Sequence, residues 1–275
     1  MSSLVGKVVI ITGASSGFAA ATAKLFAKEG CKIVLAARRI ERLEEMANEI
    51  HGAGGEALPI AMDVTQLAQI GTMAKAVVDK YGRVDILFNN AGFGRLDWFE
   101  VLDPIKDIQG QITVDLLGVI WTAHAILPQM YKQGSGHIIN MSSLGGWAAP
   151  PLYTVYSAAK FGVRGFTEAL RREAAPFGVE VSAVYPGSAA TEFQKHIGEN
   201  KAKQRFKTPA WLALTADDVG RAVVSLAKRP RRSLFLPWVM AFSIFVNSHF
   251  MGLSDSVQTR AFAPYHKENM NKSTP

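Results

Sequence analysis

The sequence has a single cysteine, and the apolar run near its C-terminus is too short to cross a membrane. Cys31 is the one cysteine, which excludes an intrachain disulfide, and its apolar neighbours favour a core position. The apolar run 234–246 has 13 residues with a serine and a proline among them, whereas a spanning helix needs ~20. Zinc-finger spacing, arginine-rich runs and interleaved basic and aromatic residues are also missing, so we predict neither a metal site nor a nucleic-acid partner.

Internal repeats, low-complexity segments and a signal peptide are likewise not seen. The first residues lead almost directly into a strand pattern, so we expect a cytoplasmic protein. With 275 residues, 48% of them hydrophobic and 19% charged, the chain is long enough for one large α/β domain or two small ones. The net charge of +7 would suit a phosphorylated cofactor, an acidic membrane surface or nucleic acid.

The N-terminal region has the pattern of a phosphate-binding turn. Residues 8–11 are a β-branched run suited to a strand buried on both faces, and a helical pattern follows the turn through Lys28. Backbone N–H groups of such a turn, together with the helix N-terminus, face a bound anion. Its two glycines permit a tight turn and a close approach. The predicted cofactor contacts are Gly13, Ser15, Ser16, Gly17 and Phe18.

The end of the second strand predicts which dinucleotide is bound. This strand, residues 31–37, is followed by Arg38 and Arg39, with no acid before Glu41. In dinucleotide folds an acid at this point binds the ribose 2′-hydroxyl, while an arginine accepts a 2′-phosphate. The pair therefore favours NADP(H); the alternative is two solvated arginines at the start of a surface helix.

Two further strands end in residues that suit a cofactor cleft. The third strand, 58–62, ends at Asp63 and Val64, where Asp63 either holds the adenine amino group or caps a helix that starts nearby. The fourth strand, 84–88, ends in a cluster of small and polar residues. Ligands of open parallel sheets bind at the carboxyl edge, so we expect this cluster there. Its members are Asn89, Asn90, Ala91 and Gly92.

The stretch 136–160 is where we place the chemistry. An apolar run that reads as a buried strand ends just before Ser143, and a helical pattern then carries Tyr156 and Lys160, one turn apart on one face. A free tyrosine titrates near pKa ~10, and a fixed positive charge beside it lowers that value. Ser143 could then hydrogen-bond the reacting oxygen. The alternative is an ordinary helix with an exposed tyrosine and a solvated lysine.

Taken together, these residues resemble the classical short-chain dehydrogenase/reductase family over about residues 7–228. The similarity rests on five short motifs in the family's order, and the spacing from Ser143 to Tyr156 also matches. The motifs are Thr12-Gly13-x-x-x-Gly17, Asn89-Asn90-Ala91-Gly92, Ser143, Tyr156-x-x-x-Lys160 and Pro186-Gly187-x-x-x-Thr191.

The resemblance implies a role for each matching residue. Tyr156 would be the catalytic acid/base, Lys160 would bind the nicotinamide ribose and lower the tyrosine pKa, and Ser143 would orient the substrate oxygen. The cofactor cleft would be lined by Asn89, Asn90, Ala91, Gly92, Pro186, Gly187 and Thr191, with Thr191 at the carboxamide or pyrophosphate.

The sequence departs from the family pattern at two positions. Ala19 stands where the glycine turn usually has a third glycine, which we expect to be tolerated. Asp115 stands where the family has a catalytic asparagine that holds a water on a proton relay through Lys160. An aspartate can accept a hydrogen bond from that water but cannot donate as an amide does, and its charge would strengthen the ammonium form of Lys160.

The second half of the chain is expected to bind the substrate. A sixth strand, 179–185, precedes a stretch at about 188–210 that in this family is the substrate lid and carries His196. Thr215 and Asp218 predict a capped helix start. Candidate substrate contacts are apolar, which indicates a lipid-like, steroid-like or aromatic carbonyl or alcohol. They are Phe93, Leu144, Trp147, Tyr153, Phe193 and Trp211, beside Ser143.

The C-terminal extension, about 234–275, has a basic cluster before its apolar run. We expect a last strand at 234–236, while 238–251 is a helix that closes an apolar pocket, builds a subunit interface or lies on a membrane. Of these we favour packing on the chain's own domain or on a neighbouring subunit. Residues 266–275 are polar and are expected to be loose.

We therefore predict one doubly wound α/β domain over residues 1–275, a parallel sheet of the Rossmann fold in three α/β/α layers. Its predicted activity is NADP(H)-dependent interconversion of a carbonyl and an alcohol, in a homodimer or homotetramer that could also meet a membrane surface. The alternative is a dinucleotide-binding regulatory or scaffold protein whose catalysis is impaired by Asp115.

Overall fold

Short runs of β-branched and other apolar residues form the strands of one parallel sheet. The computed structural model describes residues 3–188 and 212–273, and within them the strand order is β3-β2-β1-β4-β5-β6-β7. The direction of the order reverses between β1 and β4, which is the switch point where ligands of such sheets bind. The strands are β1 Val8–Thr12, β2 Lys32–Ala37, β3 Glu56–Ala61, β4 Ile86–Asn89, β5 Gly136–Met141, β6 Val179–Pro186 and β7 Ser233–Leu236.

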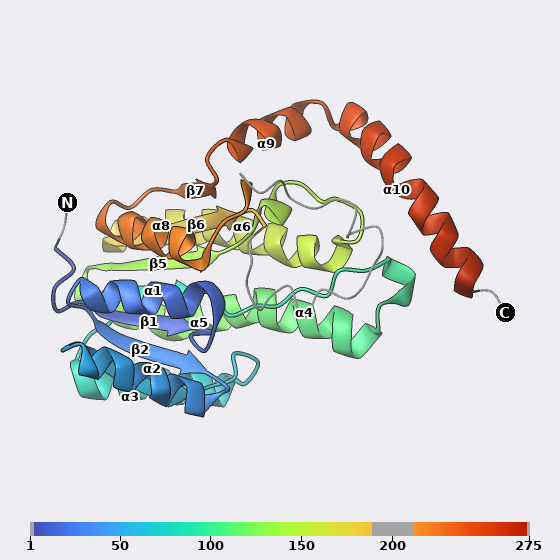
Figure 1. Cartoon of the computed structure of the whole chain (residues 1–275). Helices are drawn as coiled ribbons and strands as arrows, with labels where there is room; N and C mark the ends of the chain where they lie inside the picture. Colours follow the sequence, from blue (N-terminus) through green and yellow to red (C-terminus); the bar gives the residue numbers. More distant parts are fainter. Residues whose placement is uncertain (1–2, 189–211, 274–275) are drawn as a thin grey trace.

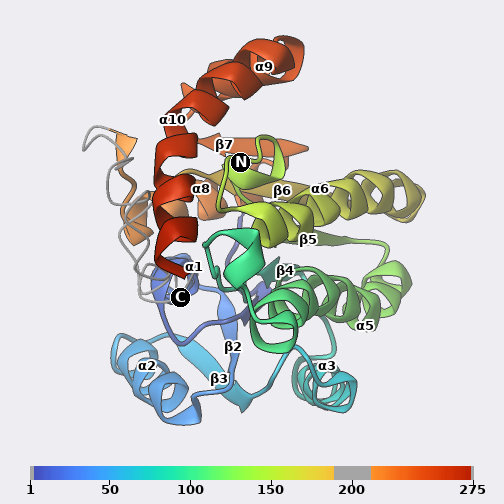
Figure 2. The same ribbon diagram turned by 90° about the vertical axis from the view of Figure 1, so that its right-hand side faces the viewer.

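Helices cover both faces of this sheet, because each strand is apolar on both sides. One face packs against α1 (Gly17–Lys28), α2 (Ile40–Gly52) and α8 (Ala216–Lys228). The opposite face packs against α3 (Leu67–Tyr81), α5 (Gly118–Gln133) and α6 (Thr154–Ala174). Figure 2 shows the two helical layers on either side of the sheet. The doubly wound, three-layer prediction is confirmed.

One long helical stretch is interrupted just where the sequence departs from the family pattern. It runs through η2 (Pro104–Gln109), α4 (Gly110–Ile112) and η3 (Thr113–Leu117) into α5. Both η2 and η3 are π-helical, a geometry that is frequent at functional sites. By length and composition the whole stretch could cross a membrane, but core helices share these properties, and its α5 part packs against β4, β5 and α6.

Two sequence predictions in the second half are confirmed at atomic detail. The Asp218 N–H donates to Thr215 Oγ1 (3.1 Å) and the Thr215 N–H donates to Asp218 Oδ2 (2.9 Å), so α8 begins with a capping box. The last strand also forms where expected, as β7. The proposed lid falls outside the described residues except for Ser188, as do Thr191, Phe193, His196 and Trp211.

The C-terminal extension forms an arm of two helices, α9 (Met240–His249) and α10 (Met251–Ser273). Figure 1 shows the arm rising beyond β7 and then crossing toward the carboxyl end of the sheet. The expectation of a loose 266–275 is wrong up to Ser273, because the His266 ring stacks on Trp98 at 4.0 Å and bonds Glu100 at 2.8 Å. Tertiary contacts thus order a polar helix end.

Packing of 238–251 on its own domain is also wrong for most of its large side chains. The helix forms, and Ile244 is buried, but Trp238, Phe242 and Phe245 are exposed. Packing on a neighbouring subunit stays a prediction.

Candidate active site

The glycine turn lies at the switch point of the sheet. Gly13 has φ +69°, and a Cβ on it would meet the Ala91 Cα atom at 2.8 Å, so only glycine fits there. The Thr12 hydroxyl accepts from the N–H groups of Asn90 (3.0 Å) and Ala91 (3.1 Å). These contacts hold the ends of β1 and β4 together at the carboxyl edge of the sheet. Thr12 was not among the predicted site residues, since its partners are 78 and 79 positions away in the chain.

Both arginines after β2 are exposed, and Arg39 lies beside this turn. The Arg39 guanidinium donates to the hydroxyls of Ser15 (2.8 Å) and Ser16 (2.9 Å). Ser16 is the residue before α1, and its side chain makes no cap bond to the helix. The N-terminal N–H groups of α1 and the Arg39 guanidinium therefore lie at the same edge, which fits a phosphorylated dinucleotide.

Asp63 has mainly local contacts in the structure, whereas Val64 packs into the core. Asp63 Oδ1 accepts from the Thr65 N–H (2.9 Å), which closes a turn, and α3 begins later, after Gln66. Asp63 therefore closes a turn that precedes α3, and it does not cap that helix. Val64 is buried, and its side chain lies so close to Gly118 that a Cβ there would meet it at 2.9 Å.

Asn89 is a structural residue and is not exposed to a cleft. Its side-chain amide donates to Asn140 Oδ1 (3.0 Å), and the Asn140 amide donates to the Thr167 hydroxyl (3.0 Å), so one buried network joins β4, β5 and α6. The implied role of Asn89 in lining the cofactor cleft is thus corrected. The network fixes the registry of α6 against the sheet, and α6 carries the central residues of the site.

Ser143, Tyr156 and Lys160 meet at the carboxyl end of β5. Ser143 follows the strand, accepts from the Gly145 N–H (3.1 Å) and hydrogen-bonds the Tyr156 hydroxyl. Tyr156 and Lys160 are both buried on α6, and the Lys160 Nζ lies 5.6 Å from the Tyr156 ring centroid. The juxtaposition predicted from spacing is present, whereas the exposed tyrosine and solvated lysine of the alternative reading are not.

A close approach of β5 and α6 holds these groups in place. The Ser142 hydroxyl donates to the Lys160 carbonyl (3.0 Å), and Lys160 Nζ donates to the Met141 carbonyl (3.4 Å). Gly146 allows this contact, because a Cβ on it would lie 2.7 Å from the Lys160 carbonyl oxygen. Burial raises the pKa of Tyr156, the Ser143 hydrogen bond acts against this, and the charge of Asp115 adds to it. The pKa of Tyr156 is thus raised overall, so the lowered pKa that the resemblance implied through Lys160 is not found.

Asp115 lies in the same buried cluster. It is 0% exposed, its Oδ1 accepts from the Phe93 N–H (2.8 Å), and its Oδ2 lies 3.6 Å from Lys160 Nζ. Oδ2 has no hydrogen-bond partner in the part of the chain that the structure describes. Burial raises the pKa of Asp115, while Lys160 and the Phe93 N–H oppose that rise. A carboxylate oxygen beside the lysine is thus left to accept one more hydrogen bond.

An apolar wall surrounds Tyr156, and much of it was not predicted. Tyr153, a predicted substrate contact, packs edge-on against Tyr156 with ring centroids 6.0 Å apart. It also belongs to a second cluster that reaches the arm. Leu96 packs on Tyr156, and the second cluster contains Trp98, Leu152, Phe262 and Tyr265. No local pattern places α10 beside this wall; Leu152, with φ +74°, marks the strained turn that precedes Tyr153.

Leu144 and Trp147, two further substrate candidates, lie toward β6 and β7. Leu144 is within reach of Gly187, at the end of β6, where a Cβ would meet Leu144 Cδ1 at 3.3 Å. The Trp147 ring packs edge-on against Tyr185 and carries the Arg164 guanidinium 3.2 Å from its centroid. Trp147 thus has a clear packing role between α6 and the sheet.

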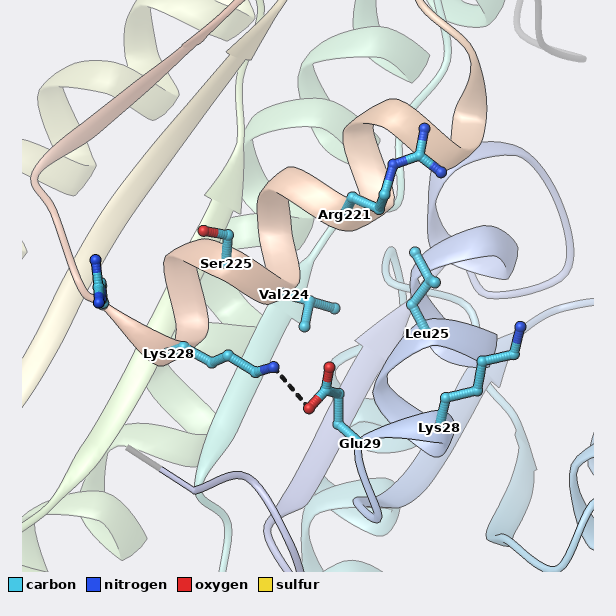
Figure 3. A pocket seen from close by; sticks show the side chains of 8 residues that line it. Leu25, Lys28, Glu29, Arg221, Val224, Ser225 and Lys228 are labelled. Carbon is cyan, nitrogen blue, oxygen red and sulfur yellow. Dashed lines mark ion pairs between the residues drawn. The ribbon is translucent and has the colours of Figure 1, made fainter. Parts of the chain in front are cut away.

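A separate surface hollow of about 320 Å³ lies between the C-terminal parts of α1 and α8 (Figure 3). Several of its lining side chains are basic, and Lys228 pairs with Glu29 at 2.6 Å. None of the residues described above for the cleft or the Tyr156 cluster lines it. The chemistry is therefore placed at the carboxyl edge of the sheet and not in this hollow.

Comparisons with known proteins agree with this geometry. The family model described as short chain dehydrogenase matches residues 7–202. An uncharacterised oxidoreductase of Staphylococcus saprophyticus is 35% identical over 236 residues, which is 85% of this chain and 94% of the relative.

Solved structures with the same fold hold either nicotinamide dinucleotide. An alcohol dehydrogenase from Thermococcus sibiricus, complexed with 5-hydroxy-NADP, is 30% identical with a TM-score of 0.74, covering 84% of this chain and 95% of its own. A short-chain dehydrogenase/reductase from Burkholderia phymatum, in complex with NAD, is 26% identical with a TM-score of 0.82, covering 92% and 97%.

Proposed function

Because the chain belongs to the short-chain dehydrogenase family and is an oxidoreductase, we propose that it interconverts a carbonyl and an alcohol on an apolar substrate with NADP(H), and that Tyr156 is the acid/base. The observation that carries this proposal is the meeting of Ser143, Tyr156 and Lys160 in one buried cluster at the end of β5. The intact cluster argues against a purely regulatory role.

In the proposed mechanism Tyr156 supplies the proton. A bound nicotinamide would supply or accept the hydride at the substrate carbon. Burial raises the pKa of Tyr156, which keeps its phenol protonated at neutral pH and suits it to donate to the oxygen of a carbonyl. The Ser143 hydroxyl, already bonded to Tyr156, is placed to hydrogen-bond the same oxygen and to orient it.

Lys160 and Asp115 would replenish that proton. Lys160 Nζ lies between Tyr156 and the carboxylate of Asp115, and Oδ2 is left to accept from a water. The family's asparagine holds such a water through an amide, and Asp115 would do so through a carboxylate that also favours the charged lysine. Asp115 is therefore proposed as a positioning residue in a working relay.

The preference for NADP(H) is supported by the charges after β2. Arg38 and Arg39 follow β2 in the sequence with no acidic residue before Glu41, and Arg39 is hydrogen-bonded to Ser15 and Ser16 of the turn. The remaining cofactor contacts proposed from the sequence are Gly13, Gly17, Phe18, Asp63, Val64, Asn90, Ala91, Gly92, Pro186, Gly187 and Thr191.

An apolar substrate is supported by the wall beside the proposed proton donor. Leu96, Tyr153 and Tyr156 form one cluster, and the second cluster around Trp98 and Leu152 continues it. These side chains offer few hydrogen bonds, so they favour a lipid-like, steroid-like or aromatic compound over a sugar or an amino acid.

A screen of apolar ketones, aldehydes and alcohols with each dinucleotide, followed by absorbance, tests the proposal. We expect turnover with NADPH or NADP, and NADPH binding at least about tenfold tighter than NADH, which is ~1.4 kcal/mol. Arg38→Ala should remove most of that preference, with Arg42→Ala, in the first turn of α2, as the control. Equal affinities in the wild type would contradict the cofactor assignment. Tight NADPH binding without any turnover would instead favour the regulatory alternative.

A further inference from the structure

The arm carries most of the large apolar side chains that this protein exposes. Among the described residues, eight of the fifteen exposed large hydrophobic side chains lie between 238 and 270. They are Trp238, Phe242, Phe245, Phe250, Met251, Leu253, Val257 and Met270. A contiguous set of this kind marks a surface that contacts something apolar, whereas scattered single side chains need no explanation.

The first three of these exposed side chains lie on α9 or just before it. Trp238, Phe242 and Phe245 are spaced four and three residues apart, so they follow one face, and their side chains are 79%, 72% and 53% exposed. Ile244 is buried and anchors the helix to the body. Figures 1 and 2 show α9 standing outward from the β7 edge of the sheet, with α10 leading away from it.

Most of the net charge lies in the same part of the chain. Residues 228–275 contain seven lysines and arginines and two acidic residues, a net charge of +5 out of +7 for the whole chain. Arg229, Arg231 and Arg232 are exposed directly before β7, which is the edge strand from which the arm rises. Apolar side chains and three exposed arginines therefore share one edge of the molecule.

We propose that this edge, formed by residues 229–232, α9 and the first half of α10, docks on a membrane surface that contains anionic lipid. Apolar aromatic side chains bury in the headgroup boundary while basic side chains meet the lipid charge. The ten residues of α9 are too few to span a bilayer, so the helix lies at the interface.

A second copy of the chain is a poorer match for this edge. A two-fold contact pairs the same surface with itself, so the three arginines of each copy would face an equally basic surface. An anionic bilayer has headgroups of the opposite charge and an apolar hydrocarbon layer beneath them. This docking does not depend on the reaction proposed above, and it is measured without any substrate.

Vesicle flotation with the full-length protein tests the proposal. We expect binding to vesicles of phosphatidylcholine with about one third phosphatidylglycerol, and at least about fivefold less binding to phosphatidylcholine alone. Raising the salt from about 0.1 M to about 1 M, which shortens the Debye length from ~10 to ~3 Å, should release a large part of the bound protein.

Paired variants separate the two contributions. Phe242→Ser with Phe245→Ser should lower vesicle binding at least about fivefold, because apolar burial is lost. Val5→Ser with Leu67→Ser, which changes two exposed apolar side chains of the body, is the matched control and should bind as wild type. Arg231→Glu with Arg232→Glu should abolish the dependence on anionic lipid, whereas Lys80→Glu with Lys132→Glu should keep it.

Thermal melting confirms that each variant is folded before it is compared. The proposal is overturned if the wild type does not float with anionic vesicles, or if the Phe242 and Phe245 variant floats as well as the wild type. Light scattering then identifies the other occupant: a wild-type dimer that this variant converts to a monomer would assign the surface to a second copy.

Discussion

The cluster around Tyr156 and the arm of α9 and α10 are both rich in large apolar side chains, yet they bury them to opposite degrees. Tyr156, Lys160 and Asp115 are at most 7% exposed; Lys160 Nζ donates to the Met141 carbonyl of β5, and Asp115 Oδ1 accepts from the Phe93 N–H. Along the arm, Ile244 is buried while Trp238 and Phe242 are exposed.

This difference shows that apolar content alone does not decide where a segment packs. The cluster lies on β5, which is an inner strand of the sheet, and on α6, which packs against that strand. Neighbouring elements therefore bury its side chains. The arm follows β7, which is the edge strand, and no further strand of the described chain pairs with β7 on its outer side. Apolar side chains near an inner strand are buried by the chain itself, whereas apolar side chains beyond the edge strand can be buried only against another surface.

The largest effect is expected at the centre of the buried cluster. Tyr156→Phe keeps the aromatic packing but removes the proton donor, so turnover should fall by at least about a thousandfold, typical of losing an acid/base group. NADPH affinity, measured by fluorescence titration, should stay within about threefold. Tyr153→Phe is the matched control and should keep most activity. Substantial turnover in the Tyr156 variant would show that the cluster is structural, like the arm.

The contact between the two regions is the next test. Phe262→Ala with Tyr265→Ala removes the side chains that join α10 to Trp98 and Leu152. Both are half-buried, so we expect a loss of about 2 kcal/mol of unfolding free energy and a Tm lower by several degrees. The KM for apolar substrates should rise while kcat changes little. Unchanged melting would mean that the arm is independent of the site.

Substitution of Asp115 tests whether this residue of the buried cluster takes part in the reaction. Asp115→Ala should lower kcat about tenfold, ~1.4 kcal/mol, because the relay water loses its acceptor. Asp115→Asn should keep or raise activity, since it restores the family's residue and still accepts a hydrogen bond. A structural role alone would be visible in the melting temperature and would leave kcat intact. An alanine variant as active as the wild type would remove Asp115 from the mechanism.

A buried histidine of the body gives a smaller, pH-dependent effect. His137 Nε2 donates to the Ser182 hydroxyl (2.8 Å), which itself donates to the Arg231 carbonyl, so Nδ1 carries no proton and is buried without a partner among the described residues. Burial lowers the pKa of His137 from 6.5 to about 4. The unfolded chain therefore takes up this proton first as the pH falls.

Stability from His137 is thus complete above about pH 6.5 and is lost as the pH falls toward 4, with a slope of at most ~1.4 kcal/mol per pH unit. Urea unfolding between pH 7 and 5 measures it. His137→Gln should flatten the slope by up to that amount, and His124→Gln, which changes an exposed histidine, should not. An equal slope in both variants would mean that other groups carry the pH dependence.

The sequence by itself determined the sheet, the glycine turn and the pairing of Tyr156 with Lys160. These depend on neighbours along the chain: β-branched runs make strands, and positions four apart share a helix face wherever that helix lies. Parallel strands all end at the same edge of a sheet, so the polar residues that follow them lie at that edge. This rule alone predicts that Ser143 and Asn90 lie near the glycine turn.

Only the tertiary structure decided which of these residues touch. Thr12 supports Asn90 and Ala91 from 78 and 79 positions away, and the Asn89 amide turns into the core toward Asn140 instead of the cleft. Likewise Asp115 meets Lys160 because a π-helical turn and α6 pack together, and Phe262 reaches Leu152 because α10 crosses the sheet's carboxyl edge. Such contacts depend on how segments distant in the sequence pack together, and the local periodicity of the sequence does not predict them.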